Sequence, residues 1–140
     1  MARKDLIHDA IVASLEKAGW TITHDPLRLV FEEKPLAIDL GAELVSAERN
    51  NQKIAVEIKS FISNSSLTDF HAALGQYINY RIALSKLEPD RALFLAVGED
   101  AYQDFFDSRF AQTVIQETKM NLIVCAIERE EVILWNEHKN

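Results

Sequence analysis

The sequence is poor in the features that mark secreted and membrane-spanning proteins. Among its 140 residues are one cysteine, three prolines and four glycines. The single cysteine, Cys125, excludes an intrachain disulfide, and its apolar neighbours predict a buried core residue. The longest apolar run, residues 92–97, is far shorter than the roughly 20 residues that a membrane-spanning helix needs. Because charged residues also occupy positions 1–9, we expect no secretory signal, and a soluble, cytoplasmic protein with no membrane contact.

Positive charge is also scarce. The chain has fifteen Lys and Arg residues and 22 Asp and Glu residues, so its formal net charge is −7. Tight nonspecific binding to DNA depends on clustered Lys and Arg, so this composition argues against such a role. It leaves room for a nuclease, because an acidic metal site adds negative charge that bound cations partly offset.

The hydrophobic pattern predicts one domain spanning residues 1–140, built from alternating helices and strands. Apolar residues spaced by three and four predict a helix over 6–18 that ends at Gly19, and Thr68 is the expected N-cap of a long helix over 69–87. A turn at 49–51 is expected to join two strands into a hairpin. The expected strands are 20–24, 27–31, 35–45, 52–60, 91–97, 121–127 and 132–135, with one or two helices over 100–119. This order predicts an α/β fold in which helices flank a central mixed β-sheet.

Two acidic residues and a lysine form the candidate chemical site. Glu57 and Lys59 are two residues apart on a strand and therefore share a face. A hairpin with the preceding strand would bring Asp39 beside Glu57. Two close carboxylates repel each other unless a cation lies between them, and oxygen ligands favour Mg²⁺ or Mn²⁺. The structural alternative is a set of solvated surface charges with a Glu57–Lys59 ion pair.

This arrangement resembles the PD-(D/E)xK nuclease superfamily, with Asp39 followed by Glu57-Ile58-Lys59 on the next strand. Ile38 stands where the pattern has proline, a mild departure. The resemblance implies a restriction-endonuclease-like fold and a site that hydrolyses DNA phosphodiester bonds. Asp39 and Glu57 would be the metal ligands, and Lys59 would activate water or stabilise negative charge.

Two further features extend the resemblance. Gln76 and Tyr80 are four residues apart on the helix that follows the motif strand, so they share a face. They resemble the Gln-x-x-x-Tyr motif of RecB-like and Holliday-junction-resolvase-like nucleases, which implies that they contact DNA or position water. The first helix of many members carries an acidic residue or a histidine near the site. His8 and Asp9 are the two candidates here, and we favour His8.

Four longer segments resemble the XisH family, the fdxN element excision controlling factors of cyanobacteria. The segments are 19–27, 38–43, 54–61 and 70–81. The resemblance implies a role in excision of a DNA element, with DNA, the small protein XisI and a site-specific recombinase as partners. A homodimer is expected by analogy with the nuclease superfamily.

Two functions are therefore open at this point. One is Mg²⁺-dependent hydrolysis of DNA by Asp39, Glu57 and Lys59. The other is a non-catalytic regulatory module that keeps the nuclease fold as a platform for XisI, recombinase or DNA. The acidic net charge favours the second function, and the complete set of motif residues favours the first.

Overall fold

The computed structural model describes residues 3–45, 51–61 and 65–138. A six-stranded sheet with the order β1-β4-β5-β6-β7-β8 forms its centre, and β2 and β3 form a separate two-stranded sheet. The elements are α1 (Arg3–Lys17), β1 (Thr21–His24), β2 (Leu27–Phe31), β3 (Lys34–Ile38), β4 (Leu40–Leu44), β5 (Gln52–Ile58), α2 (Ser66–Leu87), β6 (Arg91–Gly98), α3 (Glu99–Ala101), the π-helix η1 (Tyr102–Phe106), α4 (Arg109–Thr118), β7 (Leu122–Ala126) and β8 (Glu131–Asn136).

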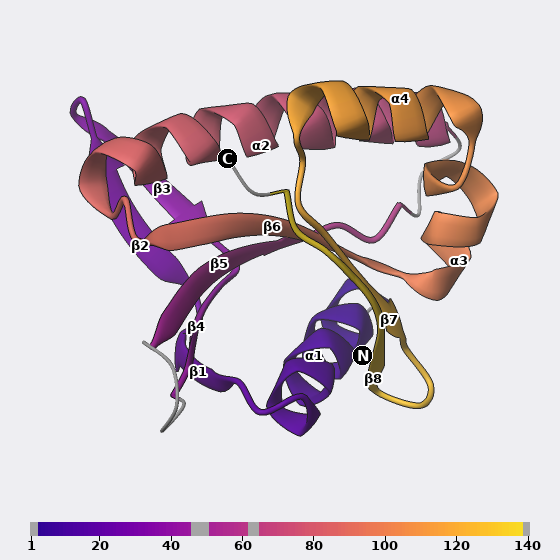
Figure 1. The fold of residues 1–140 in the computed structure, drawn as a ribbon, viewed down its shortest axis with the longest axis horizontal. Helices are drawn as coiled ribbons and strands as arrows, with labels where there is room; N and C mark the ends of the chain where they lie inside the picture. The colour runs from indigo at the N-terminus through magenta and orange to yellow at the C-terminus, as the bar shows by residue number, and fades with distance from the viewer. Residues whose placement is uncertain (1–2, 46–50, 62–64, 139–140) are drawn as a thin grey trace.

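The large sheet is mixed, as the element order predicts. Strand β5 pairs antiparallel with β4 and parallel with β6, and β6 pairs parallel with β7. Helix α1 covers one face of the sheet, and α2 and α4 cover the other (Figure 1). The expected α/β fold with a central mixed sheet flanked by helices is confirmed. No helix in the described part of the chain is long and apolar enough to cross a membrane.

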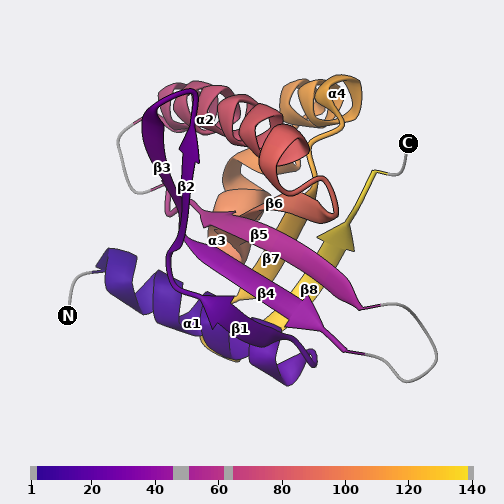
Figure 2. The same cartoon turned by 90° about the vertical axis from the view of Figure 1, so that its left-hand side faces the viewer.

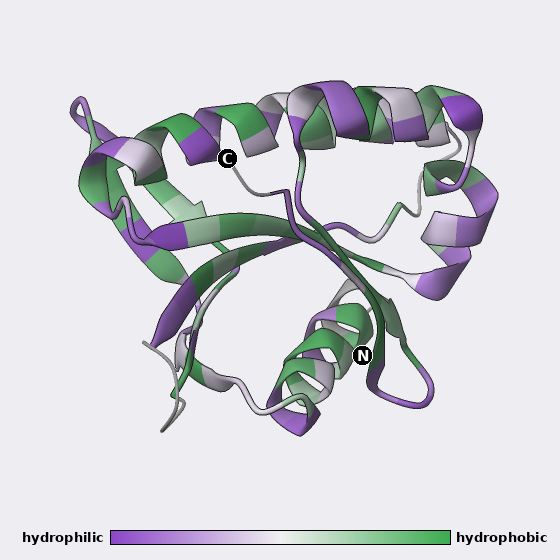
Figure 3. Ribbon diagram, viewed as in Figure 1, coloured by the Kyte–Doolittle hydropathy of each residue, from purple (hydrophilic) through white to green (hydrophobic). Residues whose placement is uncertain are grey.

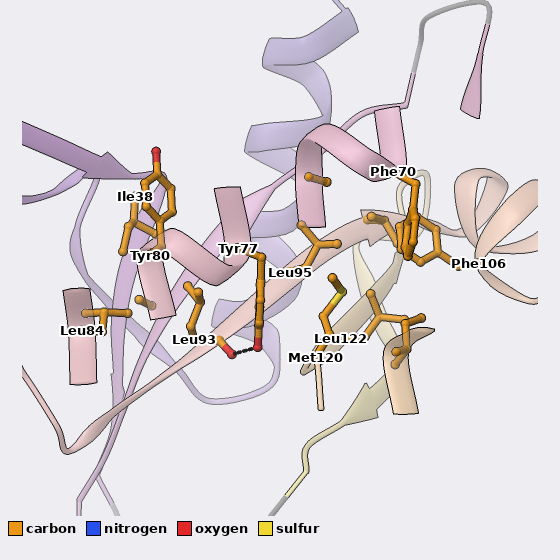
Figure 4. Packing of buried hydrophobic residues seen from close by; sticks show 14 of the residues in the cluster. Ile38, Phe70, Tyr77, Tyr80, Leu84, Leu93, Leu95, Phe106, Met120 and Leu122 are labelled. Atoms are coloured by element: carbon orange, nitrogen blue, oxygen red, sulfur yellow. Dashed lines mark hydrogen bonds between the residues drawn. The ribbon is translucent and has the colours of Figure 1, made fainter. Parts of the chain in front are cut away.

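Alternating side chains along β5 separate two hydrophobic cores. Ala55 belongs to the core beneath α2, whereas Ile54 and Val56 belong to the core beneath α1. In the first core, the Tyr77 hydroxyl donates to the carbonyl of Leu93 at 2.9 Å (Figure 4). The central strands β5, β6 and β7 are largely apolar (Figure 3). This burial on both faces explains why the central strands are rich in apolar residues.

In the second core, Trp20 and Trp135 stack with ring centroids 5.4 Å apart. Cys125 is fully buried in the same core, as its apolar neighbours predict. Burial raises the pKa of its thiol to about 11, so the thiol stays protonated and inert at neutral pH.

The prediction of one strand over 35–45 was wrong. The chain forms β3, leaves it at Asp39 and then forms β4 in the other sheet. On one side of Asp39, Ile38 pairs with Leu27 of β2, and on the other side Leu40 pairs with Val56 of β5. Upstream, Glu32 and Glu33 adopt left-handed conformations with φ of 49° and 68°. They turn β2 back onto β3, and the resulting hairpin extends from the large sheet and lies beside α2 (Figure 2). Asp39 therefore lies at the junction of the two sheets.

The predicted N-cap of α2 was also wrong. The helix begins at Ser66, and Ser65 is the N-cap with extended φ and ψ of −131° and 105°. The Ser65 side chain accepts a hydrogen bond from the Thr68 backbone N–H at 3.2 Å, so Thr68 is the capped residue. Several Ser and Thr residues in this segment compete for the position, and sequence alone does not rank them.

The hairpin of β4 and β5 is confirmed by its antiparallel register, in which Leu40 pairs with Val56. Residues 49 and 50 of its predicted turn lie outside the described residues. The region predicted to hold one or two helices contains α3, η1 and α4. Ser108 separates η1 from α4 and caps α4 by accepting from the Ala111 N–H at 3.2 Å.

Candidate functional site

Asp39 and Glu57 meet where the β2–β3 hairpin joins the large sheet. Each carboxylate accepts a hydrogen bond from the backbone of the other strand. The Asp39 N–H donates to Glu57 Oε1 at 3.1 Å, and the Ile58 N–H donates to Asp39 Oδ2 at 2.8 Å. The antiparallel register of β4 and β5 brings these residues together, because Leu40 pairs with Val56 and the next residues outward are Asp39 and Glu57.

Lys59 places an ammonium group beside this pair. Its Nζ lies 3.4 Å from Glu57 Oε2. The Lys59 N–H donates to the carbonyl of Ala96 at 3.0 Å, which extends the pairing of β5 with β6 past the end of the strand. The alternation of side chains therefore continues, and Ile58 packs against the α1 core while Glu57 and Lys59 point to the other face.

The Glu57 carboxylate is under electrostatic strain. It is only 5% exposed. Burial and, after it, the negative charge of Asp39 raise its pKa from 4.5 to about 7. Lys59 acts in the opposite direction and lowers the pKa. The scaffold thus holds a carboxylate whose charged form is incompletely compensated. A bound cation would relieve that strain by favouring the ionised form.

Helix α2 contributes Gln76 and Tyr80 to the same region. Gln76 Nε2 donates to the Tyr80 hydroxyl oxygen at 2.9 Å. Burial and then the Glu57 charge raise the pKa of the Tyr80 phenol, so it stays protonated at neutral pH. Gln76 Oε1 is buried and has no hydrogen-bond partner among the described residues. An acceptor in this state is suited to a bound molecule that brings a donor.

The side chain of His8 also reaches the site, whereas Asp9 is exposed and does not line the cavity. His8 Nε2 lies 3.0 Å and 3.1 Å from the two carboxylate oxygens of Asp25. Asp25 therefore orients the imidazole of His8. The neighbouring His24 lies with its Nδ1 2.9 Å from the Thr23 hydroxyl.

These side chains line one cavity of about 570 Å³ between the end of β5 and α2. Its lining residues are His8, Ala37, Asp39, Glu57, Ile58, Lys59, Ser60, Phe61, Asp69, Ala72, Ala73, Gln76 and Tyr80. All six residues singled out from the sequence are present. Glu43 does not line it, and lies at the other end of β4 opposite Thr21.

Sequence reasoning missed two acidic residues of this region. Asp69 precedes Gln76 by seven residues, which is two helical turns, so the helical period could have identified it. Asp25 could not be found from local spacing, because its contact with His8 spans 17 positions and joins α1 to the connection between β1 and β2. No group of three His, Cys, Asp or Glu side chains that could hold a metal occurs in the part of the chain that the structure describes.

The comparisons with known proteins agree on one family. The family model described as XisH protein matches residues 1–133. The crystal structure of an XisH family protein from Nostoc punctiforme PCC 73102 superposes with a TM-score of 0.86 and 39% identity, covering 95% of this chain and 100% of that chain.

A second crystal structure is that of an fdxN element excision controlling factor protein from Anabaena variabilis. It superposes with a TM-score of 0.86 and 42% identity, covering 95% of this chain and 99% of that chain. No curated protein matches. The family match over almost the whole chain, together with these two structures, confirms the resemblance found in the sequence: the chain belongs to the XisH family.

Proposed function

We propose that this protein acts in the excision of a DNA element and that its cavity hydrolyses DNA phosphodiester bonds with a divalent cation. The excision role rests on family membership and on the similarity to the Anabaena variabilis excision controlling factor. The hydrolytic role rests on one observation above all. Asp39 and Glu57 converge from neighbouring strands, with the Lys59 ammonium 3.4 Å from Glu57, as in PD-(D/E)xK nucleases.

The donor set suits Mg²⁺ or Mn²⁺. Asp39 and Glu57 supply carboxylate oxygens, and the described residues offer no third acidic, His or Cys group for the same ion. Mg²⁺ is commonly held by one or two carboxylates, with waters and substrate phosphates completing its shell. Burial and the Asp39 charge raise the pKa of Glu57 to about 7, as expected for a buried carboxylate pair that Lys59 neutralises only in part. When bound, such an ion would polarise the phosphate and lower the pKa of a bound water.

The other side chains have separate roles in this proposal. Lys59 stabilises the negative charge that develops on the phosphate, or orients the attacking water. Gln76 and Tyr80 hold each other in place by their 2.9 Å hydrogen bond and position the DNA strand. His8 is fixed by Asp25 and is placed to exchange a proton with the reacting oxygen atoms.

A cleavage assay with metal-binding measurements tests the proposal. The purified protein is incubated with supercoiled, linear, branched and single-stranded DNA in Mg²⁺ and in Mn²⁺, with and without an XisI-like partner. We expect cleavage that Asp39→Ala and Lys59→Ala each reduce by at least about 100-fold, consistent with loss of a group that stabilises transition-state charge. In calorimetry, Asp39→Asn should abolish Mn²⁺ binding whereas Lys59→Ala should retain it. Equal background cleavage by the wild type and both alanine variants would refute hydrolysis.

A second candidate function is a non-catalytic module that binds an XisI-like partner, a recombinase or DNA. The net charge of −7 favours it, since electrostatic attraction to DNA is weak for such a chain. This candidate predicts that Asp39→Ala lowers partner affinity or excision without any wild-type cleavage to lose. Homodimerisation and a cytoplasmic location remain part of the proposal, and sedimentation and cell fractionation test them.

A further inference from the structure

The β2–β3 hairpin places one arginine opposite a residue of the cavity lining. In its register, Arg28 pairs with Ala37, and Leu27 pairs with Ile38. Paired residues on antiparallel strands point to the same side. Leu27 and Ile38 are buried in the core beneath α2, so Arg28 and Ala37 lie on the opposite face of the hairpin.

That opposite face leads directly into the site. Ala37 lines the cavity, and Asp39, two residues further along the chain, lines it as well. Arg28 pairs directly with Ala37, so it lies beside a residue of the cavity lining. Directly paired residues on antiparallel strands have Cβ atoms about 4.5–5.5 Å apart, so the long Arg28 side chain can reach towards the cavity.

The Arg28 side chain is available to a ligand. It is exposed, and it makes no ion pair with any residue that the structure describes. Within the described cavity lining, Lys59 is the one lysine or arginine, and its ammonium already contacts Glu57. A nucleic-acid strand carries a phosphate at every nucleotide, so a strand that enters an acidic cavity needs a cation outside the carboxylate pair.

We propose that Arg28 binds a backbone phosphate of the DNA strand that enters the cavity, one or two nucleotides from the phosphate at Asp39 and Glu57. The proposal rests on the proposed function, because it assigns the substrate-binding face of that same site. Arginine suits this role, since its planar guanidinium donates two parallel hydrogen bonds to phosphate oxygens. The hairpin then acts as a DNA-contacting arm on a chain that is acidic as a whole. Figure 2 shows that arm standing beside α2, clear of the large sheet.

The test measures DNA affinity separately from cleavage. Fluorescently labelled single-stranded and duplex oligonucleotides are titrated with wild type, Arg28→Ala and Arg28→Lys in Ca²⁺ at several salt concentrations. Arg129→Ala is the matched control, because Arg129 is 59% exposed and lies in the turn between β7 and β8. We expect Arg28→Ala to weaken binding about fivefold and to lower the slope of log affinity against log salt by about 0.7–0.9. Arg28→Lys should keep the slope and recover part of the affinity.

Three outcomes count against the assignment, and a fourth supports it without cleavage. Equal affinity and salt slope for Arg28→Ala and Arg129→Ala overturn it, even if the wild type cleaves DNA. Altered sedimentation of Arg28→Ala with unchanged DNA affinity overturns it in favour of a protein contact. A wild type that binds no DNA overturns it together with the proposed function. A wild type that binds through Arg28 and does not cleave supports the assignment and refutes hydrolysis alone.

Discussion

Two buried charged residues at opposite ends of the central strands have opposite environments. Arg91 begins β6 and Glu57 lies near the end of β5, and they are 6% and 5% exposed. Glu57 pairs with Leu95, four residues beyond Arg91, so the two charges are about 13 Å apart along the sheet at ~3.3 Å per residue.

The scaffold compensates the Arg91 charge more completely than the Glu57 charge, although Lys59 lies 3.4 Å from Glu57. Arg91 Nε donates to Glu88 Oε1 at 3.0 Å, and its Nη1 donates to the carbonyl of Ile54 at 2.9 Å. Glu57 instead faces the Asp39 carboxylate. Burial and that neighbouring charge raise its pKa to about 7. Burial alone therefore does not identify a candidate functional residue. A buried charge that the fold compensates incompletely is the stronger candidate.

Removing the compensated charge should have the largest effect on stability. Arg91→Ala leaves the Ile54 carbonyl without its donor and Glu88 without its partner. We expect the free energy of unfolding to fall by about 3–5 kcal/mol in urea denaturation. Arg129→Ala, which removes only an exposed 3.5 Å pair with Glu131, should change it by less than about 1 kcal/mol. Similar losses for the two variants would remove the distinction between the two ends of the sheet.

Removing the Glu57 charge should instead raise the free energy of unfolding. Glu57 has a pKa near 4.5 in the unfolded chain and about 7 in the fold. Below pH 4.5 it is protonated in both states and costs nothing. Between pH 4.5 and 7 the unfolded state has released its proton while the folded state retains it, so wild-type stability falls across this window and levels off above pH 7. In metal-free buffer, Glu57→Gln should exceed wild type by up to about 3 kcal/mol at pH 8 and match it near pH 4.

Chemical denaturation of both proteins from pH 4 to pH 8 measures this difference. Saturating Mn²⁺ should stabilise the wild type and leave Glu57→Gln almost unchanged, which reverses their order at pH 8. A stability difference that is constant across the pH range would show that the Glu57 carboxyl is not the titrating group.

Two tyrosines on α2 extend the comparison with a smaller effect. The Tyr77 hydroxyl donates to the Leu93 carbonyl and accepts from the Asn121 N–H, each at 2.9 Å, whereas the Tyr80 hydroxyl accepts from Gln76 beside the cavity. We expect Tyr77→Phe to cost about 2 kcal/mol of stability and Tyr80→Phe about 1 kcal/mol or less. Tyr80→Phe should instead lower DNA cleavage. Equal stability losses with unchanged cleavage would assign both hydroxyls to the scaffold.

Most of the correct predictions about the candidate site came from the periodicity of single helices and strands. Alternation along residues 52–60 predicted that Glu57 and Lys59 share a face, and helical spacing predicted the same for Gln76 and Tyr80. Both follow from local geometry that each segment adopts on its own. The order of elements then predicted the hairpin of β4 with β5, and with it the convergence of Asp39 and Glu57.

Contacts between distant elements could not be predicted in the same way. The turn of the β2–β3 hairpin uses two left-handed residues, Glu32 and Glu33, neither of which is glycine or asparagine. The pairing of His8 with Asp25 depends on how α1 crosses the sheet. The position of Arg28 depends on the register of a hairpin that the sequence did not separate from β4.

The hydrogen bonds that the Asp39 and Glu57 side chains accept from backbone N–H groups also hold the β2–β3 hairpin against the large sheet. Through Glu57 Oε1 and Asp39 Oδ2, each side chain ties down the main chain of the neighbouring strand at the place where β3 departs from the large sheet. An ion bound by those oxygens, as proposed, would therefore act on the junction of the two sheets as well as on the proposed site. The position of the hairpin and the binding of that ion would then depend on the same two atoms.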